Sequence, residues 1–341
     1  MLLSLLVAAC DAGPRDPERH VGPPVRLLGA NVGPDRPMPA DGVVQLAFDR
    51  YLLPSTVVRQ SVVLADANGE PVTGADAPLV TYDPIARTVT LSSPKAPAAP
   101  WLLEGQPYKV ALRLPTNDDT NEEGLRAIDR AALDPNQPLE IGFFVGPPSG
   151  AASHEPGVQF CADVLPLLKQ RCAGCHYAGA GAAGLALDSA TSVARTALNR
   201  IAQGANTGGR SSGTDETGKV FGIDMRIVEP GNPGRSWLLY KVELARAPVV
   251  EAGVTAPLLC ANAEAAPARD YQPLAPAQPW PADAERSVLG DHVLGREMPY
   301  PASPLASPIE QPLTFHERQR LRMWIAQGAK VSECGECRPA E

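Results

Sequence analysis

The sequence predicts two domains, an all-β sandwich followed by a mostly α domain with loop insertions. A chain of 341 residues is long for one hydrophobic core, since domains average about 150 residues. Residues 25–146 contain short β-rich runs separated by turn dipeptides, whereas residues 158–341 contain signals for helix starts and stops. Because the chain has 37 prolines, 30 glycines and only 5% aromatic residues, we expect short elements and long connections.

The predicted organisation has five parts. In chain order they are a signal peptide (1–9), a tether (10–24), the β-sandwich (25–146), a linker (147–157) and the helical domain (158–341). The linker is assigned by its composition, because the sequence PPSGAASHEPG is rich in Pro, Gly and Ser. We expect this linker to separate a spacer from the chemically active half.

The N-terminal segment has the pattern of a targeting signal. Residues 1–9 (MLLSLLVAA) are apolar, end in small side chains and are far shorter than the ~20 residues that span a bilayer. Val7-Ala8-Ala9-Cys10 resembles a bacterial lipobox, which implies cleavage before Cys10 and lipidation of its thiol. Since no Lys or Arg precedes the apolar run, a buried apolar N-terminus is the alternative. The expected protein is exported and lipid-anchored at the periplasmic or cell-surface side of a bacterial membrane.

The first half of the chain is rich in strand-forming runs. The expected strands cover residues 43–48, 61–64, 88–91, 108–112 and 141–145. Asn68-Gly69 and Asp83-Pro84 supply turn signals between them, as in a β-sandwich.

The order of these patterns is similar to that of a known family. The carrying segments are residues 41–42 (DG), 46–49 (LAFD), 53–57 (LPSTV), 68–69 (NG), 88–91 (TVTL) and 105–108 (GQPY). Together they resemble the bacterial Ig-like domain found in surface-layer proteins. The resemblance implies a spacer or a binding module. We find no paired acid, nucleophile or metal cluster in this part of the sequence.

The most specific motif in the chain is Cys172-Ala173-Gly174-Cys175-His176. A Cys-x-x-Cys-His run is the attachment signal of a c-type haem. Two thiols on one turn can each form a thioether with one vinyl group of a single porphyrin, and the next imidazole can then bind the iron. The motif therefore predicts one covalent haem c, with His176 as the proximal iron ligand, and a role in moving electrons.

Other interpretations of the motif are a disulfide, a redox-active dithiol and half of a zinc site. A thioredoxin-like dithiol expects a βαβ context, which the Gly/Ala run after Tyr177 does not supply. Zinc needs a second ligand pair at a finger-like spacing, and the nearest later cysteine is Cys260. Haem attachment is the favoured interpretation.

Helices are expected on both sides of the motif. Residues 163–171 form a short amphipathic segment with an acid near its start and basic residues at its end, as the helix dipole prefers. Thr314 and Glu317 form a capping box that begins a second helix. Its apolar residues lie three and four apart, and Gly328 ends it.

The second iron ligand is predicted to be Met298. It precedes a proline in an irregular segment between the motif and the capped helix. A thioether opposite His176 suits iron in its lower oxidation state and raises the reduction potential. Met225, His292, His316 or an open position remain the alternatives.

The second half resembles a class I-like cytochrome c domain of the kind found in exported planctomycete and myxobacterial proteins. The carrying segments are residues 165–168 (LPLL), 172–176 (CAGCH), 184–188 (GLALD), 228–233 (VEPGNP), 236–238 (SWL), 298–299 (MP), 324–325 (WI) and 328–329 (GA). The resemblance implies a mostly helical fold with one haem, ligated by His176 and Met298. An Ala/Pro-rich insertion at about residues 248–281 departs from the family pattern.

Four further cysteines predict disulfides. They are Cys161, Cys260, Cys334 and Cys337. An even number in an exported chain indicates two bonds, for which three connectivities are possible. The pair Cys334 and Cys337 lacks a following His, and two neighbouring glutamates oppose thiolate formation.

These patterns predict an electron carrier rather than an enzyme. Its expected partners are a redox protein and a membrane reached through Cys10. The net charge of −8 shows no basic footprint for nucleic acid, and no nucleotide cofactor is expected. The alternatives are a haem enzyme, peroxidase-like or oxidase-associated, with an open distal site, and a non-catalytic surface-binding lipoprotein.

Overall fold

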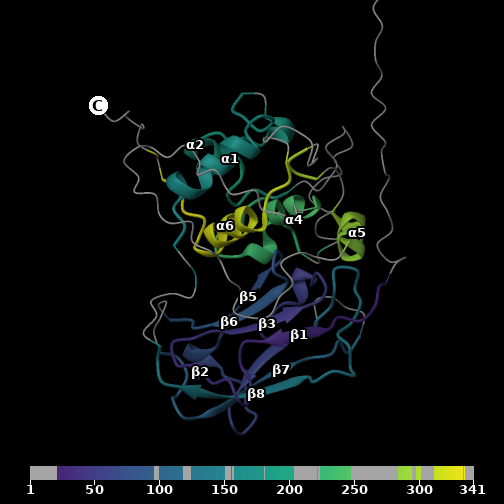
Figure 1. The fold of residues 1–341 in the computed structure, drawn as a ribbon, viewed down its shortest axis with the longest axis vertical. Helices are drawn as coiled ribbons and strands as arrows, with labels where there is room; N and C mark the ends of the chain where they lie inside the picture. Colours follow the sequence, from purple (N-terminus) through teal and green to yellow (C-terminus); the bar gives the residue numbers. More distant parts are fainter. Residues whose placement is uncertain are drawn as a thin grey trace, which may run out of the picture.

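The computed structural model of the chain shows a β half and a helical half packed against each other (Figure 1). The described residues are 21–95, 100–117, 124–149, 155, 157–179, 181–202, 221, 223–246, 283–293, 297–300, 311–332 and 334. The predicted signal peptide and lipidation site Cys10, and the disulfide candidates Cys260 and Cys337, lie outside these residues.

The β half consists of two four-stranded sheets. Its strands are β1 (Leu27–Ala30), β2 (Met38–Pro39), β3 (Val44–Phe48), β4 (Val62–Ala65), β5 (Leu79–Asp83), β6 (Thr88–Ser92), β7 (Pro107–Leu112) and β8 (Glu140–Gly146). One sheet has the order β1-β3-β6-β5 and the other β2-β8-β7-β4. Neighbouring strands are antiparallel except β2 and β8. The predicted β-sandwich is therefore present.

Strand β3 is buried along its whole length, which explains its imperfect alternation of apolar and polar residues. Its apolar residues Val44, Leu46 and Phe48 belong to the core of the sandwich. Gln45 lines a cavity that Arg322 of the helical half also lines. The helical half thus covers a sheet face that would otherwise meet water, so β3 has no exposed side.

The helical half contains short elements joined by irregular segments. They are η4 (Phe160–Val164, π-helical), α1 (Leu165–Arg171), η5 (Ala182–Gly184), α2 (Ala190–Thr196), η6 (Pro233–Arg235), α4 (Trp237–Glu243), α5 (Asp283–His292) and α6 (Phe315–Ala326). Two 3-10 turns, η2 (Pro54–Thr56) and η3 (Gly74–Asp76), belong to the β half. None of the described helices is long and apolar enough to cross a membrane.

Helix α6 begins and ends as its sequence predicts. The Thr314 side chain accepts the Glu317 N–H, and the Glu317 carboxylate accepts the Thr314 N–H, which completes the capping box. Gly328, with φ +94°, follows the last turn in the left-handed region that favours glycine. The apolar residues Leu321, Trp324 and Ile325 lie in the core of the helical half.

The opposite, polar face of α6 is also buried, because it contacts the β half and α4. Arg318 donates to Glu243 of α4 at 2.7 Å. Gln319 donates to Asp83 of β5 at 3.1 Å, and Arg322 lies 3.4 Å from the same carboxylate. The two halves are therefore in direct contact, rather than held apart as a spacer would hold them.

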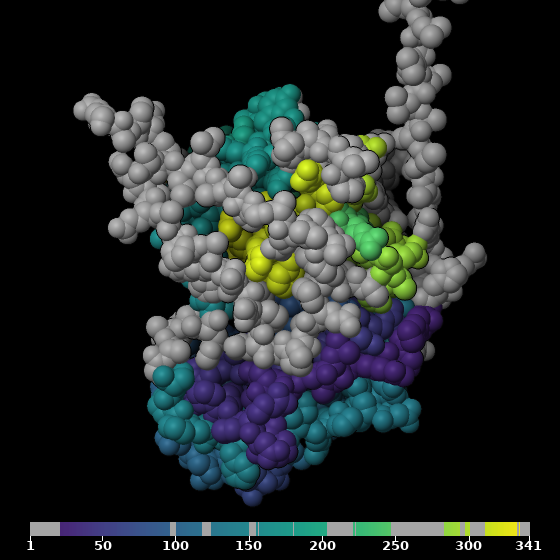
Figure 2. Space-filling view, viewed as in Figure 1, coloured from purple at the N-terminus to yellow at the C-terminus, as the bar shows by residue number. Residues whose placement is uncertain are grey.

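A second set of buried contacts joins the halves near α5. The Arg50 guanidinium lies between Asp129, at 2.7 Å, and Glu285 of α5, at 3.0 Å. The Tyr51 hydroxyl donates to Glu243 at 2.8 Å. Figure 2 shows α5 next to the N-terminal, purple part of the β half on this face of the molecule, where Glu285 accepts from Arg50. The two halves thus form one packed body.

Candidate haem-binding site

The Cys-x-x-Cys-His motif folds as a compact turn at the end of α1. The N–H of Cys172 donates to the Leu168 carbonyl at 2.8 Å and continues the helix. The N–H groups of Cys175 and His176 then both donate to the Cys172 carbonyl, at 3.2 and 2.9 Å. Both thiols and the imidazole therefore project from one turn, as attachment to a single porphyrin requires.

The two thiols differ in exposure. Cys172 is half-buried against the apolar cluster of the helical half, whereas Cys175 is exposed. The two thiols are not bonded to each other. Burial first, and the nearby Glu317 carboxylate second, raise the pKa of the Cys172 thiol to about 12. A redox-active dithiol needs a lowered pKa, so this environment argues against that alternative.

The His176 imidazole is oriented by its own loop. Its Nδ1 lies 3.2 Å from the Ala182 carbonyl, which can only accept, so Nδ1 carries the proton and donates. Burial lowers the pKa of His176, which favours the neutral ring. A neutral imidazole with Nδ1–H bound to a backbone carbonyl leaves the Nε2 lone pair for a metal, so this residue fits the ligand role.

The loop after the motif folds back to hold that carbonyl in place. Ala182 donates to the Cys175 carbonyl at 3.0 Å, and Leu187 donates to the His176 carbonyl at 2.8 Å. At Gly181 an added Cβ would lie only 2.2 Å from the Leu185 carbonyl oxygen, so the close return of the chain requires glycine. The imidazole therefore has a preformed partner.

Met298 lies on the border of the same apolar cluster as Cys172. It is half-buried, and its N–H donates to the Lys241 carbonyl at the end of α4, at 3.2 Å. The fold thus brings the predicted distal ligand to the cluster that borders the attachment turn, across more than a hundred residues of sequence.

The alternative distal ligands occupy other places. Met225 is fully buried in a different apolar cluster, at the junction of the two halves. His292 is 5% exposed on α5, whose Leu289 and the following Val293 belong to that junction cluster. Its Nδ1 lies 2.9 Å from the Val288 carbonyl, and its Nε2 has no hydrogen-bond partner among the described residues. Met298 is therefore the better placed of these three.

His316, the remaining alternative, is in the first turn of α6 beside Phe315, with which its ring makes an edge contact. Among the described residues, no group of three or more His, Cys, Asp and Glu side chains could hold a metal ion. The predicted iron ligands, one imidazole and one thioether, would not form such a group, because methionine is not one of those four residue types.

A disulfide joins Cys161 to Cys334, with their Cα atoms 5.5 Å apart. It connects the π-helical turn η4, which leads into α1, to the segment after α6. This is one of the pairings that the sequence left open. The bond therefore ties the turn that precedes α1 to the segment that follows α6.

Sequence reasoning missed one side-chain contact of the site. Arg171, the last residue of α1, donates to Glu317 Oε1 through Nε at 3.2 Å and Nη2 at 2.9 Å. Both residues had been interpreted locally, one as a charge that favours the helix end and the other as a capping residue. The sequence does not indicate that Arg171 and Glu317 form an ion pair, because the two residues are 146 positions apart.

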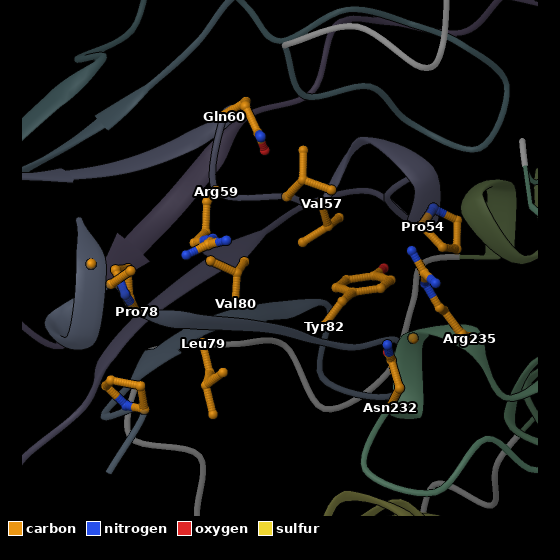
Figure 3. A pocket seen from close by; sticks show the side chains of 15 residues that line it. Pro54, Val57, Arg59, Gln60, Pro78, Leu79, Val80, Tyr82, Asn232 and Arg235 are labelled. Carbon is orange, nitrogen blue, oxygen red and sulfur yellow. The ribbon is translucent and has the colours of Figure 1, made fainter. Parts of the chain in front are cut away.

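Two cavities of the described residues lie away from this turn. One of about 500 Å³ lies between β5 and the η6 region, where Val80 and Tyr82 face Asn232 and Arg235 (Figure 3). The other, of about 530 Å³, lies between the sheet and the end of α6. Neither is lined by a candidate haem residue.

No protein-family model and no curated protein matches the chain. Among solved structures, surface-layer protein SbsC, domains 1-6, matches with 12% identity and a TM-score of 0.25, over 38% of this chain and 14% of that one. The S-layer protein rSbsC(31-844) matches with 11% identity and a TM-score of 0.26, over 42% and 17%. The chain thus spans less than a fifth of either structure, and likeness at this level carries no argument about its fold or function.

Proposed function

We propose that this chain is a c-type cytochrome that carries electrons, with one haem bound covalently to Cys172 and Cys175 and ligated by His176 and Met298. The observation that carries the proposal is the attachment motif folded as one turn, with its imidazole already oriented by the Ala182 carbonyl. The helical half is then a cytochrome c domain, and the β half is an Ig-like domain of the surface-layer type. The protein is exported and anchored through a lipid on Cys10.

In this proposal a bound haem supplies an iron that alternates between two oxidation states. Cys172 and Cys175 would hold the porphyrin through two thioethers from a single turn, which would fix its orientation. The Nδ1–H bond of His176 keeps the ring from rotating and leaves Nε2 available. The apolar cluster that borders Cys172 and Met298 excludes water from this side of the site.

The β half has a larger role in this proposal than a spacer. Its residues Asp83 and Tyr51 bind α6 and α4 through buried hydrogen bonds. Packing of this kind supports the helices that carry the site, so the β half is a structural part of the electron carrier.

The proposal is tested by producing the full chain with a c-type cytochrome maturation system. The wild type should show a covalent pyridine haemochrome and a Met-to-iron charge-transfer band. Cys175→Ala should weaken covalent attachment. Met298→Ala should lose the charge-transfer band, and Met225→Leu should keep it as the matched control.

Two outcomes would contradict parts of the proposal. If the wild type binds no covalent haem, the electron-carrier function is wrong. If haem is present but Met298→Ala leaves the spectrum unchanged, the distal ligand is another group or an open position, and a haem enzyme becomes the better hypothesis.

A further inference from the structure

A nearly buried ion pair stands directly beside the attachment turn. Arg171 immediately precedes Cys172, and its guanidinium donates twice to one Glu317 oxygen, at 3.2 and 2.9 Å. The Arg171 side chain is 11% exposed and that of Glu317 is 6% exposed. Charges so far removed from water are weakly screened, so they act on neighbouring groups over a longer distance than surface charges do.

The carboxylate of this pair has a fixed position. Glu317 Oε2 accepts the Thr314 N–H at 2.8 Å, while Oε1 accepts both Arg171 bonds. Each oxygen therefore has its own partner, one on the start of α6 and the other on the end of α1. The pair clamps the helix that carries the attachment turn to the helix that closes the domain.

The Glu317 charge reaches the attachment turn. It adds to burial in raising the pKa of the Cys172 thiol, and Arg171 opposes it. The two charges thus act in opposite directions on the atom to which the porphyrin edge is expected to bind. With both present their fields largely cancel, but removal of either leaves one uncompensated charge in a poorly screened environment.

We propose that Arg171 and Glu317 form a compensated charge pair that positions the attachment turn and keeps either charge alone from shifting the reduction potential of the haem. This inference rests on the proposed covalent haem. The negative charge of Glu317 favours the oxidised iron, which carries one more positive charge, and the positive charge of Arg171 favours the reduced iron. Both residues are positioning residues, because they act through the turn and the field and do not bind the iron.

The test compares four variants of the full haem-loaded chain by potentiometric titration. Glu317→Gln should raise the reduction potential and Arg171→Gln should lower it. At a fixed applied potential, each single substitution should change the ratio of reduced to oxidised haem about tenfold. This is the size expected for one unit charge that acts over roughly 10 Å at an effective dielectric constant of about 20. The double variant Arg171→Gln/Glu317→Gln should return close to the wild-type ratio, and Arg171→Lys should remain near it.

The variants are chosen to separate charge from structure. Gln is also accepted at the third helical position of a capping box, so Glu317→Gln keeps the start of α6. Arg171→Gln could unfold because Glu317 is left buried without its cation. In that case Glu317→Gln and the double variant still show whether removal of the negative charge raises the reduction potential. Lys109→Gln, which breaks an exposed pair with Glu140 in the β half, is the matched control and should leave the potential unchanged.

The outcomes distinguish this inference from the proposed function. A wild type without covalent haem overturns both. Covalent haem with potentials that do not move, or that move in the same direction in both single variants, overturns the charge-pair inference alone. Shifts of opposite sign that cancel in the double variant support it, since a purely structural loss would not change sign with the charge removed.

Discussion

The two halves of this protein differ in how they obtain their cores. The apolar core of the β half is built from residues between Val25 and Val145, all of them its own. The helical half has two clusters, and both include residues of the β half, namely Ile85 in one and Tyr51 and Ile128 in the other. The β half therefore builds its apolar core from its own residues, whereas the helical half needs residues of the β half to complete its apolar clusters.

Two ion pairs of the protein differ in how far they are removed from solvent. In the β half, the pair of Lys109 and Glu140 is exposed to solvent, where such pairs contribute little. At the junction, Arg318 and Glu243 are each at most 1% exposed and bind each other at 2.7 Å. A pair buried this deeply costs much to break, and this one joins α4 to α6 within the helical half.

The substitution with the largest expected effect on stability is Arg318→Ala. It leaves the Glu243 carboxylate buried with the Tyr51 hydroxyl but without its cation, and we expect a loss of about 3–5 kcal/mol. Hydrogen exchange resolved by segment should show the helical half opening first while β3 and β7 stay protected. Lys109→Ala is the control, with an expected loss of about 1 kcal/mol or less. Equal loss of protection in both halves would contradict the difference between them.

The disulfide offers the next test, because it lies entirely in the helical half. Replacing both Cys161 and Cys334 by Ser should lower the free energy of unfolding by about 2–4 kcal/mol. Denaturation should show the loss in the helical transition only. An equal loss in the transitions of both halves would mean that they unfold as one cooperative unit, which would contradict the difference between them.

A third test uses a buried lysine of α4. Burial lowers the pKa of Lys241 to about 8 from 10.5, and Glu297 opposes the change. Because its pKa is lower in the folded state, the folded protein binds fewer protons between pH 8 and 10.5, and stability rises with pH across that window.

Lys241→Met should therefore flatten the dependence of the free energy of unfolding on pH in that window, by up to about 3 kcal/mol. Denaturation at several pH values from 7.5 to 10.5 measures it. A dependence that is equally steep in the variant would assign the effect to another group.

The smallest test compares two glycines. An added Cβ at Gly234 would lie 2.9 Å from Tyr82 Cβ, at the contact between η6 and β5, so Gly234→Ala should cost about 1–3 kcal/mol. Gly290 in α5 has open space around it, and Gly290→Ala should stabilise by about 0.5–1 kcal/mol. Thermal denaturation of both variants checks the two signs, and a neutral Gly234→Ala would mean that the halves adjust freely at this contact.

The parts of the fold that were predictable are those with local causes. The runs that became β3, β4, β6, β7 and β8 alternate or end at turn dipeptides, and the capping box of α6 spans only Thr314 to Glu317. The strands β1, β2 and β5 were missed. Strand β5 ends at Asp83, a turn-forming residue whose pairing in the sheet becomes favourable only when Thr88 of β6 lies opposite.

The burial of the polar face of α6 is a feature that its sequence does not indicate. A helix with one apolar stripe is expected to expose its other side, yet Arg318, Gln319 and Arg322 are all at most 4% exposed. Their partners Glu243 and Asp83 come from distant parts of the chain. No periodicity in the helix itself marks such a face as an interface.

The sequence by itself determined the attachment turn, its preceding helix and the cap of α6, because these rest on hydrogen bonds between residues a few positions apart. Only the tertiary structure decided where Met298 lies and that Glu317 binds Arg171. The physical reason is that a buried charge needs a partner, but many residues of opposite charge qualify. Which one is reached depends on the packing of elements that lie far apart in the sequence.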